Sequence, residues 1–154
     1  MRKIRYAVAM SLDGHIAGPN EEYDWIGTDP EVDFGAMWSQ FDALLMGRRT
    51  YKLAVQTRGK AAFTAFTGVR SIVFSRTLKR QEHPHVAVVP ELNADWVRDL
   101  KAQSGKDIWL FGGSNLFRSF FDGCSSFAFL NSISPRGRSD SLISARVATT
   151  PLSS

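Results

Sequence analysis

Short apolar runs and amphipathic stretches alternate along this chain, with glycine, proline and polar residues between them. A continuous apolar run of about four to eight residues is typical of a strand covered on both faces, whereas apolar residues three and four positions apart indicate a helix. By the first criterion, strands are predicted at residues 4–10, 43–46, 71–75, 86–89 and 108–111. By the second, helices are predicted at residues 29–41, 48–55, 93–104 and from 114 onward.

Three of these helices carry signals at their ends. Asp29 suits the N-cap of the first helix, and Pro30 suits its first helical position. Asn93 is the predicted N-cap of the third helix, and Gly105 its stop. The last helix is predicted to be capped by Ser114 or Asn115. The first helix has one apolar stripe, formed by Phe34, Met37, Trp38 and Phe41.

The order of the elements predicts the architecture. Strands and helices alternate, which favours an α/β sandwich with a mostly parallel central sheet. Ligands of such sheets bind at the carboxyl ends of the strands. Residues 11–27 form a long, partly apolar loop between the first strand and the first helix, and compact domains often use a loop of that length for function.

Three strand ends carry the residue types that a phosphate site needs. Arginine binds phosphate in a bidentate manner, and a helix start offers free N–H groups at the positive end of its dipole. A glycine between a strand and a helix is also an ordinary turn, so each segment alone is a weak signal. The three segments are Gly47-Arg48-Arg49-Thr50, Ser75-Arg76 and Gly112-Gly113-Ser114-Asn115.

Composition narrows the class of protein. The chain has 154 residues, 44% of them hydrophobic and 22% charged, which fits one globular domain. No apolar run is long enough for a membrane span. The net charge of +4 is spread out, without a basic stripe interleaved with aromatics, so a nucleic-acid partner is not expected. We expect a soluble, cytoplasmic protein.

The few histidines and the single cysteine predict no metal site. Cys124 is alone, which excludes an internal disulfide. His83 and His85 stand close together, but no third ligand accompanies them.

The end of the chain differs from the rest. Residues 123–154 are rich in serine and show little sustained alternation, although a weak strand near residues 126–133 is compatible with them. We therefore divide the chain into a domain at residues 1–122 and a divergent segment at residues 123–154, either part of the same domain or partly disordered.

Four stretches of the chain together resemble the dihydrofolate-reductase-like superfamily, and most closely its branch related to the RibD C-terminal reductase domain of riboflavin biosynthesis. The resemblance covers about residues 3–122. It is carried by Ala7-Val8-Ala9-Met10-Ser11-Leu12-Asp13-Gly14-His15-Ile16-Ala17, Leu45-Met46-Gly47-Arg48-Arg49-Thr50-Tyr51, Val73-Phe74-Ser75-Arg76 and Ile108-Trp109-Leu110-Phe111-Gly112-Gly113-Ser114-Asn115-Leu116-Phe117.

The resemblance implies a three-layer sandwich with helices on both faces of the sheet, and an NADPH-dependent reductase. The reaction would be hydride transfer to a small polar substrate, as in 5-amino-6-(5-phosphoribosylamino)uracil reductase. A homodimer is compatible with this class. The family also suggests a cis peptide at the glycine pair, and it implies that Asp13 acts on the substrate.

The cofactor-binding residues implied by the resemblance fall into four groups. Ala9 and Ile16 would touch the nicotinamide amide. Ser75 and Arg76 would receive the 2′-phosphate. The pyrophosphate and adenosine phosphate region would be held by Gly47, Arg48, Arg49 and Thr50. The cofactor backbone would approach a helix start formed by Gly112, Gly113, Ser114, Asn115 and Leu116.

Two alternatives remain open at this level. A true dihydrofolate reductase carries a carboxylate on its first helix, where this chain has Val32 between Glu31 and Asp33, and a neighbouring position points in another direction. A nucleotide-binding module without turnover is the second alternative, because the end of the chain departs from the family pattern.

Overall fold

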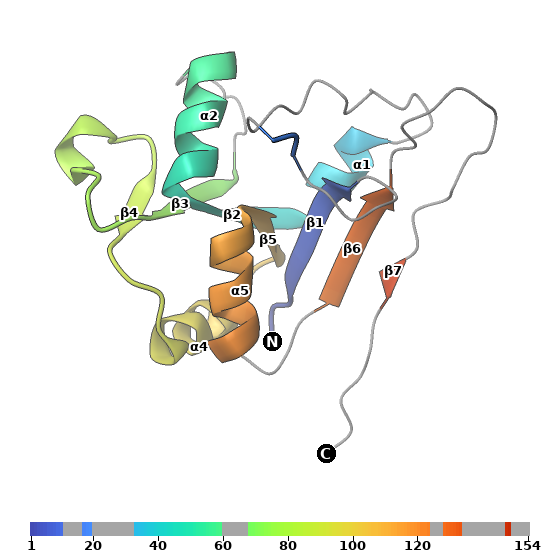
Figure 1. Cartoon of the computed structure of the whole chain (residues 1–154). Coiled ribbons are helices and arrows are strands. Elements are labelled where there is room, and N and C mark those ends of the chain that lie inside the picture. Colours follow the sequence, from blue (N-terminus) through green and yellow to red (C-terminus); the bar gives the residue numbers. More distant parts are fainter. Residues whose placement is uncertain (11–16, 20–32, 60–67, 124–127, 134–146, 149–154) are drawn as a thin grey trace.

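The computed structural model describes residues 1–10, 17–19, 33–59, 68–123, 128–133 and 147–148 (Figure 1). Its strands are β1 (Ile4–Met10), β2 (Phe41–Gly47), β3 (Arg70–Phe74), β4 (Ala87–Val89), β5 (Asp107–Gly112), β6 (Ala128–Ile133) and β7 (Val147–Ala148). Its helices are α1 (Phe34–Trp38), α2 (Arg48–Arg58), α4 (Ala94–Ala102) and α5 (Ser114–Gly123), with a 3₁₀ turn η1 (Arg80–Glu82).

The described strands form one sheet in the order β4-β3-β2-β5-β1-β6-β7. Every neighbouring pair is parallel except β6 and β7, which are antiparallel. The predicted α/β class with a mostly parallel sheet is therefore confirmed.

Helices cover both faces of the sheet (Figure 1). One core contains Leu45, Ile72 and Leu110 of the sheet under α4 and α5. The other contains Leu44 and Met46, which point the opposite way, under α1 and α2. Neighbouring residues of a strand face opposite sides, so this division follows from the pleat. The three-layer arrangement implied by the resemblance is present.

The first helix is shorter than predicted. Asp33 is its N-cap, and the Asp33 carboxylate accepts a hydrogen bond of 2.8 Å from the Ala36 backbone N–H. The helix ends at Trp38, and Phe41 is the first residue of β2, so the predicted extension to Phe41 is wrong. The reason is burial: Phe41 packs on Trp109 in the same core that receives Trp38. An apolar residue at helical spacing can thus belong to the next element.

Two other helix ends also differ from the prediction. Asn93 caps α4 as expected, accepting a hydrogen bond of 2.8 Å from the Trp96 N–H, but the helix ends at a Gln103 C-cap rather than at Gly105. Helix α5 begins at Ser114 itself. The Gly113 carbonyl accepts the first helical bond, from the Phe117 N–H at 3.0 Å, so neither Ser114 nor Asn115 is the cap.

The described parts of residues 123–154 extend the same sheet. Strand β6 pairs with β1 over six residue positions and thus covers the edge that β1 would otherwise expose. The weak strand near residues 126–133 is confirmed. Several predicted features lie outside the described residues: Asp29 and Pro30, the predicted loop 11–27 apart from residues 17–19, and Cys124.

A buried arginine ties the start of the chain to the amino ends of two other strands. The Arg2 guanidinium pairs with the Asp42 carboxylate and donates a 2.6 Å hydrogen bond from Nε to the Lys106 carbonyl. The second Asp42 oxygen accepts the Lys106 backbone N–H at 2.8 Å. Gly105 lies directly against this carboxylate with φ +148°, so a Cβ there would collide with Asp42.

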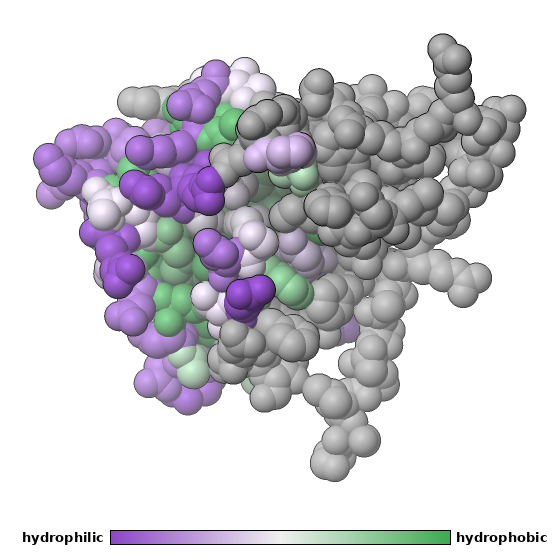
Figure 2. Space-filling model, in the orientation of Figure 1, coloured by the Kyte–Doolittle hydropathy of each residue, from purple (hydrophilic) through white to green (hydrophobic). Residues whose placement is uncertain are grey.

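No helix among the described residues is long and apolar enough to cross a membrane. Hydrophilic residues dominate the visible described surface over α2 and the β3–β4 connection (Figure 2).

The contact between Gly105 and Asp42 predicts that a side chain at residue 105 destabilises the fold more than one at Gly59. Gly105→Ala combines positive-φ strain with displacement of Asp42 from Arg2, and we expect it to lower the free energy of unfolding by about 3–5 kcal/mol. Gly59→Ala is the matched control, because Gly59 has φ +72° and open space around its Cβ position, so only strain of about 1–3 kcal/mol is expected. Urea denaturation of both variants tests this, and equal losses would contradict it.

Candidate functional site

The three predicted strand ends lie at one edge of the sheet, on adjacent strands. Strand β2 is the neighbour of both β3 and β5. The register places Gly47 beside Phe74 and Met46 beside Gly112. All three strands run in the same direction, so the segments that follow them emerge together. We call this edge, with residues 47–50, 75–78 and 112–115, the strand-end site.

Helix α2 contributes its first turn. Gly47 is the N-cap and has no side chain with which to satisfy the helix N–H groups. Arg48 and Arg49 are exposed on this turn, and Arg48 donates a 3.2 Å hydrogen bond to the Thr77 hydroxyl. A helix start of this kind favours an anion, through its free N–H groups and through its dipole.

Ser75 has a structural role in the turn after β3. Its side chain is buried, and its oxygen accepts hydrogen bonds from the Thr77 and Leu78 backbone N–H groups at 3.2 and 3.1 Å. The Ser75 N–H in turn donates to the Val89 carbonyl at 2.9 Å. Ser75 therefore shapes the turn after β3, and Arg76 is the exposed cation that this turn presents.

The glycine pair brings the second helix start against the first. The Gly112–Gly113 peptide bond is cis, as the resemblance suggests. A Cβ added to Gly113 would lie 3.3 Å from the Thr50 hydroxyl oxygen, and one added to Gly47 would lie 3.8 Å from the Gly113 nitrogen. Residues 47–50 and 112–114 are thus in contact, and the fit is tightest between Gly113 and Thr50.

Each of the two helices is anchored close to its start. On α5, Phe117 stacks on Tyr6 with ring centroids 4.3 Å apart, and Phe120 is fully buried. Leu116 is 9% exposed and packs in the same core, and its Cβ lies 3.9 Å from the position of a Cβ added to Gly47. Ser114 and Asn115 are exposed.

On α2 the anchor is Tyr51, which sequence reasoning missed. Its side chain is 1% exposed, and its hydroxyl is 2.7 Å from Nδ1 of His83 and 2.9 Å from Nε2 of His85. Burial raises the pKa of the Tyr51 hydroxyl, so it stays protonated and can donate one hydrogen bond while accepting the other. The sequence signal for this contact was His83-Pro84-His85, because two histidines so close together can both reach one hydroxyl group.

The remaining predicted residues belong to β1 and the segment after it. Ala9 lies at the carboxyl end of β1, paired with Ser132 of β6. Asp13 and Ile16 lie outside the described residues. Among the described residues of the strand-end site, the polar side chains are arginines, hydroxyls and an amide, which can bind and orient an anion but offer no carboxylate or imidazole.

The chain belongs to the RibD C-terminal domain family, whose model matches residues 2–123. Among curated proteins, it is similar to "Uncharacterized protein YyaP" of Bacillus subtilis (strain 168), with 32% identity over 129 residues, 79% of this chain and 68% of YyaP. It is also similar to "Uncharacterized protein YwjB" of the same organism, with 23% identity over 137 residues, 87% of this chain and 77% of YwjB.

Two solved structures share the fold. The first is the "Putative riboflavin biosynthesis protein" from Shewanella sp. PV-4, with TM-score 0.63 and 23% identity, covering 87% of this chain and 77% of that one. The second is the diaminohydroxyphosphoribosylaminopyrimidine deaminase/5-amino-6-(5-phosphoribosylamino)uracil reductase from Thermotoga maritima, with TM-score 0.58 and 19% identity. That match covers 85% of this chain but 44% of the Thermotoga protein.

The close approach at Gly113 predicts a loss of anion binding without a loss of the fold. In Gly113→Ala the added Cβ presses on Thr50, and we expect NADPH affinity to fall about tenfold or more at a stability cost of about 1–3 kcal/mol. NADPH affinity and thermal unfolding are measured on the same variant.

Gly68→Ala is the control for that experiment, because a Cβ at Gly68 meets open space and the residue precedes β3 at the other end of the sheet. Its NADPH affinity should equal that of the wild type. A folded Gly113→Ala protein with unchanged NADPH affinity would show that the glycine pair is only a turn.

Proposed function

We propose that this protein is an NADPH-dependent reductase that transfers a hydride to a small polar substrate, of the kind found in riboflavin biosynthesis. One observation carries the proposal. Two helix starts and an arginine-bearing turn converge at the carboxyl ends of the adjacent strands β2, β3 and β5. A dinucleotide with a diphosphate and a further phosphate is the ligand that such an arrangement suits.

The described residues fit NADPH by their chemistry. The first turn of α2, with Arg48 and Arg49, would hold the phosphate region, and Arg76 would receive the 2′-phosphate as a charge-assisted donor. Gly112 and Gly113 would admit the cofactor backbone, since a Cβ at Gly113 already crowds the Thr50 hydroxyl. Ala9 and Ile16, at and after the end of β1, would adjoin the nicotinamide.

When bound, NADPH supplies the hydride from C4 of its nicotinamide ring. The task of the protein is then to place the substrate against the ring and to exclude water, which accelerates transfer by orientation rather than by covalent catalysis. Asp13 would accept hydrogen bonds from a substrate hydroxyl or ring N–H and thereby fix the substrate at the ring.

The family supports the proposed substrate class. The acceptor is a heterocycle or a C=O or C=N group on a small polar molecule, and the reductase activity in the name of the Thermotoga protein supports this class. Dihydrofolate is disfavoured, because the Asp33 carboxylate is engaged as the cap of α1 and the preceding position is a valine.

A two-stage measurement tests the function. Tryptophan fluorescence is titrated with NADPH and with NADH, and NADPH oxidation at 340 nm is then followed with candidate pyrimidine, pterin and carbonyl substrates. Binding with turnover supports the reductase. Binding without turnover on every substrate favours a nucleotide-binding module, and absence of NADPH binding overturns the proposal.

Arg76 is expected to select NADPH over NADH. Removal of a charge-assisted contact at this exposed position should weaken NADPH by about tenfold in Arg76→Ala and leave NADH nearly unchanged. Arg98→Ala, which removes another exposed arginine, paired with Asp95 on α4, is the control for net charge. Equal affinity of the wild type for the two cofactors would contradict this role.

Asp13 is expected to affect turnover and not cofactor binding. Asp13→Asn keeps the size and the turn preference of the residue but removes the negative charge. We expect the turnover number to fall at least about tenfold, with NADPH affinity within about twofold of wild type. A fully active Asn variant, assayed on a substrate that the wild type reduces, would assign Asp13 to the turn alone.

A further inference from the structure

The exposed side chain of Thr77 connects two parts of the strand-end site. Thr77 lies in the turn after β3, and its hydroxyl oxygen accepts the 3.2 Å hydrogen bond from Nη1 of Arg48 at the start of α2. Strands β3 and β5 flank β2 on opposite sides, so this bond draws the Arg48 guanidinium toward β3 and away from the glycine pair that ends β5. Arg48 therefore reaches the same turn that carries Arg76.

The turn holds Thr77 in a fixed position. The buried Ser75 oxygen accepts hydrogen bonds from the Thr77 and Leu78 backbone N–H groups, at 3.2 and 3.1 Å. The Ser75 N–H is bonded to the Val89 carbonyl of β4, and Leu78 packs against the core that contains Tyr51. Threonine is branched at Cβ, which restricts its side chain to few rotamers. The hydroxyl group of Thr77 is thus tied to the sheet and to the core.

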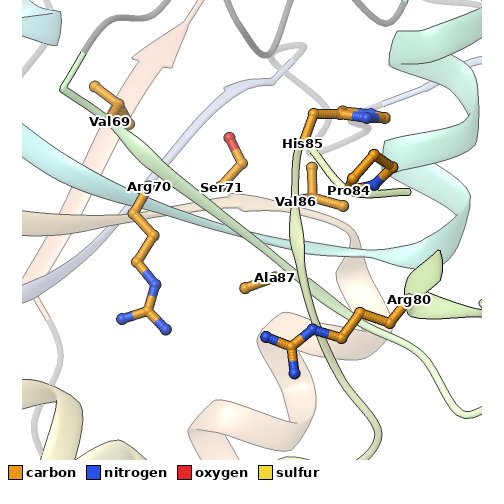
Figure 3. A pocket seen from close by; sticks show the side chains of 8 residues that line it. All are labelled: Val69, Arg70, Ser71, Arg80, Pro84, His85, Val86 and Ala87. Atoms are coloured by element: carbon orange, nitrogen blue, oxygen red, sulfur yellow. The ribbon is translucent and has the colours of Figure 1, made fainter. Parts of the chain in front are cut away.

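The chain beyond the turn is also attached to α2. It passes through η1 and returns beside β3, where His85 and Val86 line a cavity (Figure 3). The His85 Nε2 atom is 2.9 Å from the Tyr51 hydroxyl of α2, and Val86 is buried in the same core. Helix α2 and the turn are therefore linked at a second place, which sets the distance between Thr77 and the start of α2.

Arg48 is the flexible partner in this contact. An arginine side chain has many rotamers, and a ligand that binds it must restrict them. A hydrogen bond to a fixed hydroxyl restricts them before the ligand arrives, and such preorganisation raises affinity. The bond to Thr77 uses one N–H donor of the guanidinium, so the other donors can still bind a phosphate oxygen.

Positive charge on this side of the site is not neutralised by the described residues. Neither Arg48 nor Arg76 forms an ion pair with a described acidic side chain. Glu82, which follows the turn, pairs with Lys79 at 3.4 Å. An anionic group that reaches the turn after β3 therefore meets guanidinium groups that are free to receive it.

We propose that Thr77 is a positioning residue, which holds Arg48 for the 2′-phosphate of NADPH and thereby contributes to the choice of NADPH over NADH. The inference rests on the proposed function, because it concerns the cofactor of the reductase. The 2′-phosphate is the anionic group that NADPH has and NADH lacks. Loss of the Thr77 hydroxyl should therefore affect the two cofactors differently.

Calorimetric titration of the full chain with NADPH and with NADH tests this role. Thr77→Val removes the hydroxyl but keeps the branched Cβ, and we expect it to weaken NADPH about three- to tenfold and to leave NADH within about twofold. Thr77→Ala should show the same loss. Thr77→Ser keeps the hydroxyl and should stay within about twofold of wild type. Thr57→Val, which removes a hydroxyl from the last turn of α2, is the matched control and should bind as the wild type does.

A double-mutant cycle shows whether Thr77 acts through Arg48. Arg48→Gln alone should weaken NADPH by about tenfold, and Thr77→Val should cause no further loss in that background. A residue that only stabilises the turn would weaken NADPH by the same factor in both backgrounds and would weaken NADH as well. Both side chains are exposed, so the variants should fold, and thermal unfolding verifies this.

Three outcomes would overturn the proposal: unchanged NADPH affinity in folded Thr77→Val and Thr77→Ala, equal losses for NADPH and NADH, or an undiminished effect of Thr77→Val in the Arg48→Gln background. If the wild type prefers NADPH in these experiments, the proposed function still stands. A wild-type protein that binds neither cofactor would overturn the proposed function together with this inference.

Discussion

The parallel pairing of β2 with both β3 and β5 is the constraint on which the candidate site depends. It makes three segments that are distant in sequence leave the sheet at the same edge. Reversal of any one of these strands would send its end segment to the opposite edge. Gly113 then fits tightly against the Thr50 hydroxyl, and the two helix starts adjoin one space.

The alternation of side chains along β2 determines the faces on which helices α2 and α5 pack. Alternate residues of β2 face opposite cores, so α2 and α5 pack on opposite faces while their first turns meet at the sheet edge. Tyr51 and Phe117 hold these turns by different means: a hydroxyl shared by two histidines on one face, and an aromatic stack on Tyr6 on the other. A substitution in either core can therefore alter the strand-end site without contacting a ligand.

The sequence predicted those features that local chemistry determines. The apolar runs gave five strands within a few residues of their observed bounds, and the strand-end motifs were found because glycine and arginine stand out after such runs. The limits of α1 were missed, since helical spacing cannot tell whether Phe41 belongs to a helix or to the strand that follows. The partners of Tyr51 and of Arg2 come from distant segments, and the two backbone N–H groups that Ser75 accepts were not predicted because such a turn has no sequence signature.

The place of β1 in the sheet has a consequence for synthesis of the protein. β1 is made first, yet its partners β5 and β6 follow roughly 100 residues or more later. At about 5–20 residues per second, a ribosome would leave this apolar strand unpaired for roughly 5–20 seconds, whereas β2, β3 and β4 can associate as they emerge. The nascent chain thus exposes this apolar strand until β5 and β6 have been synthesised.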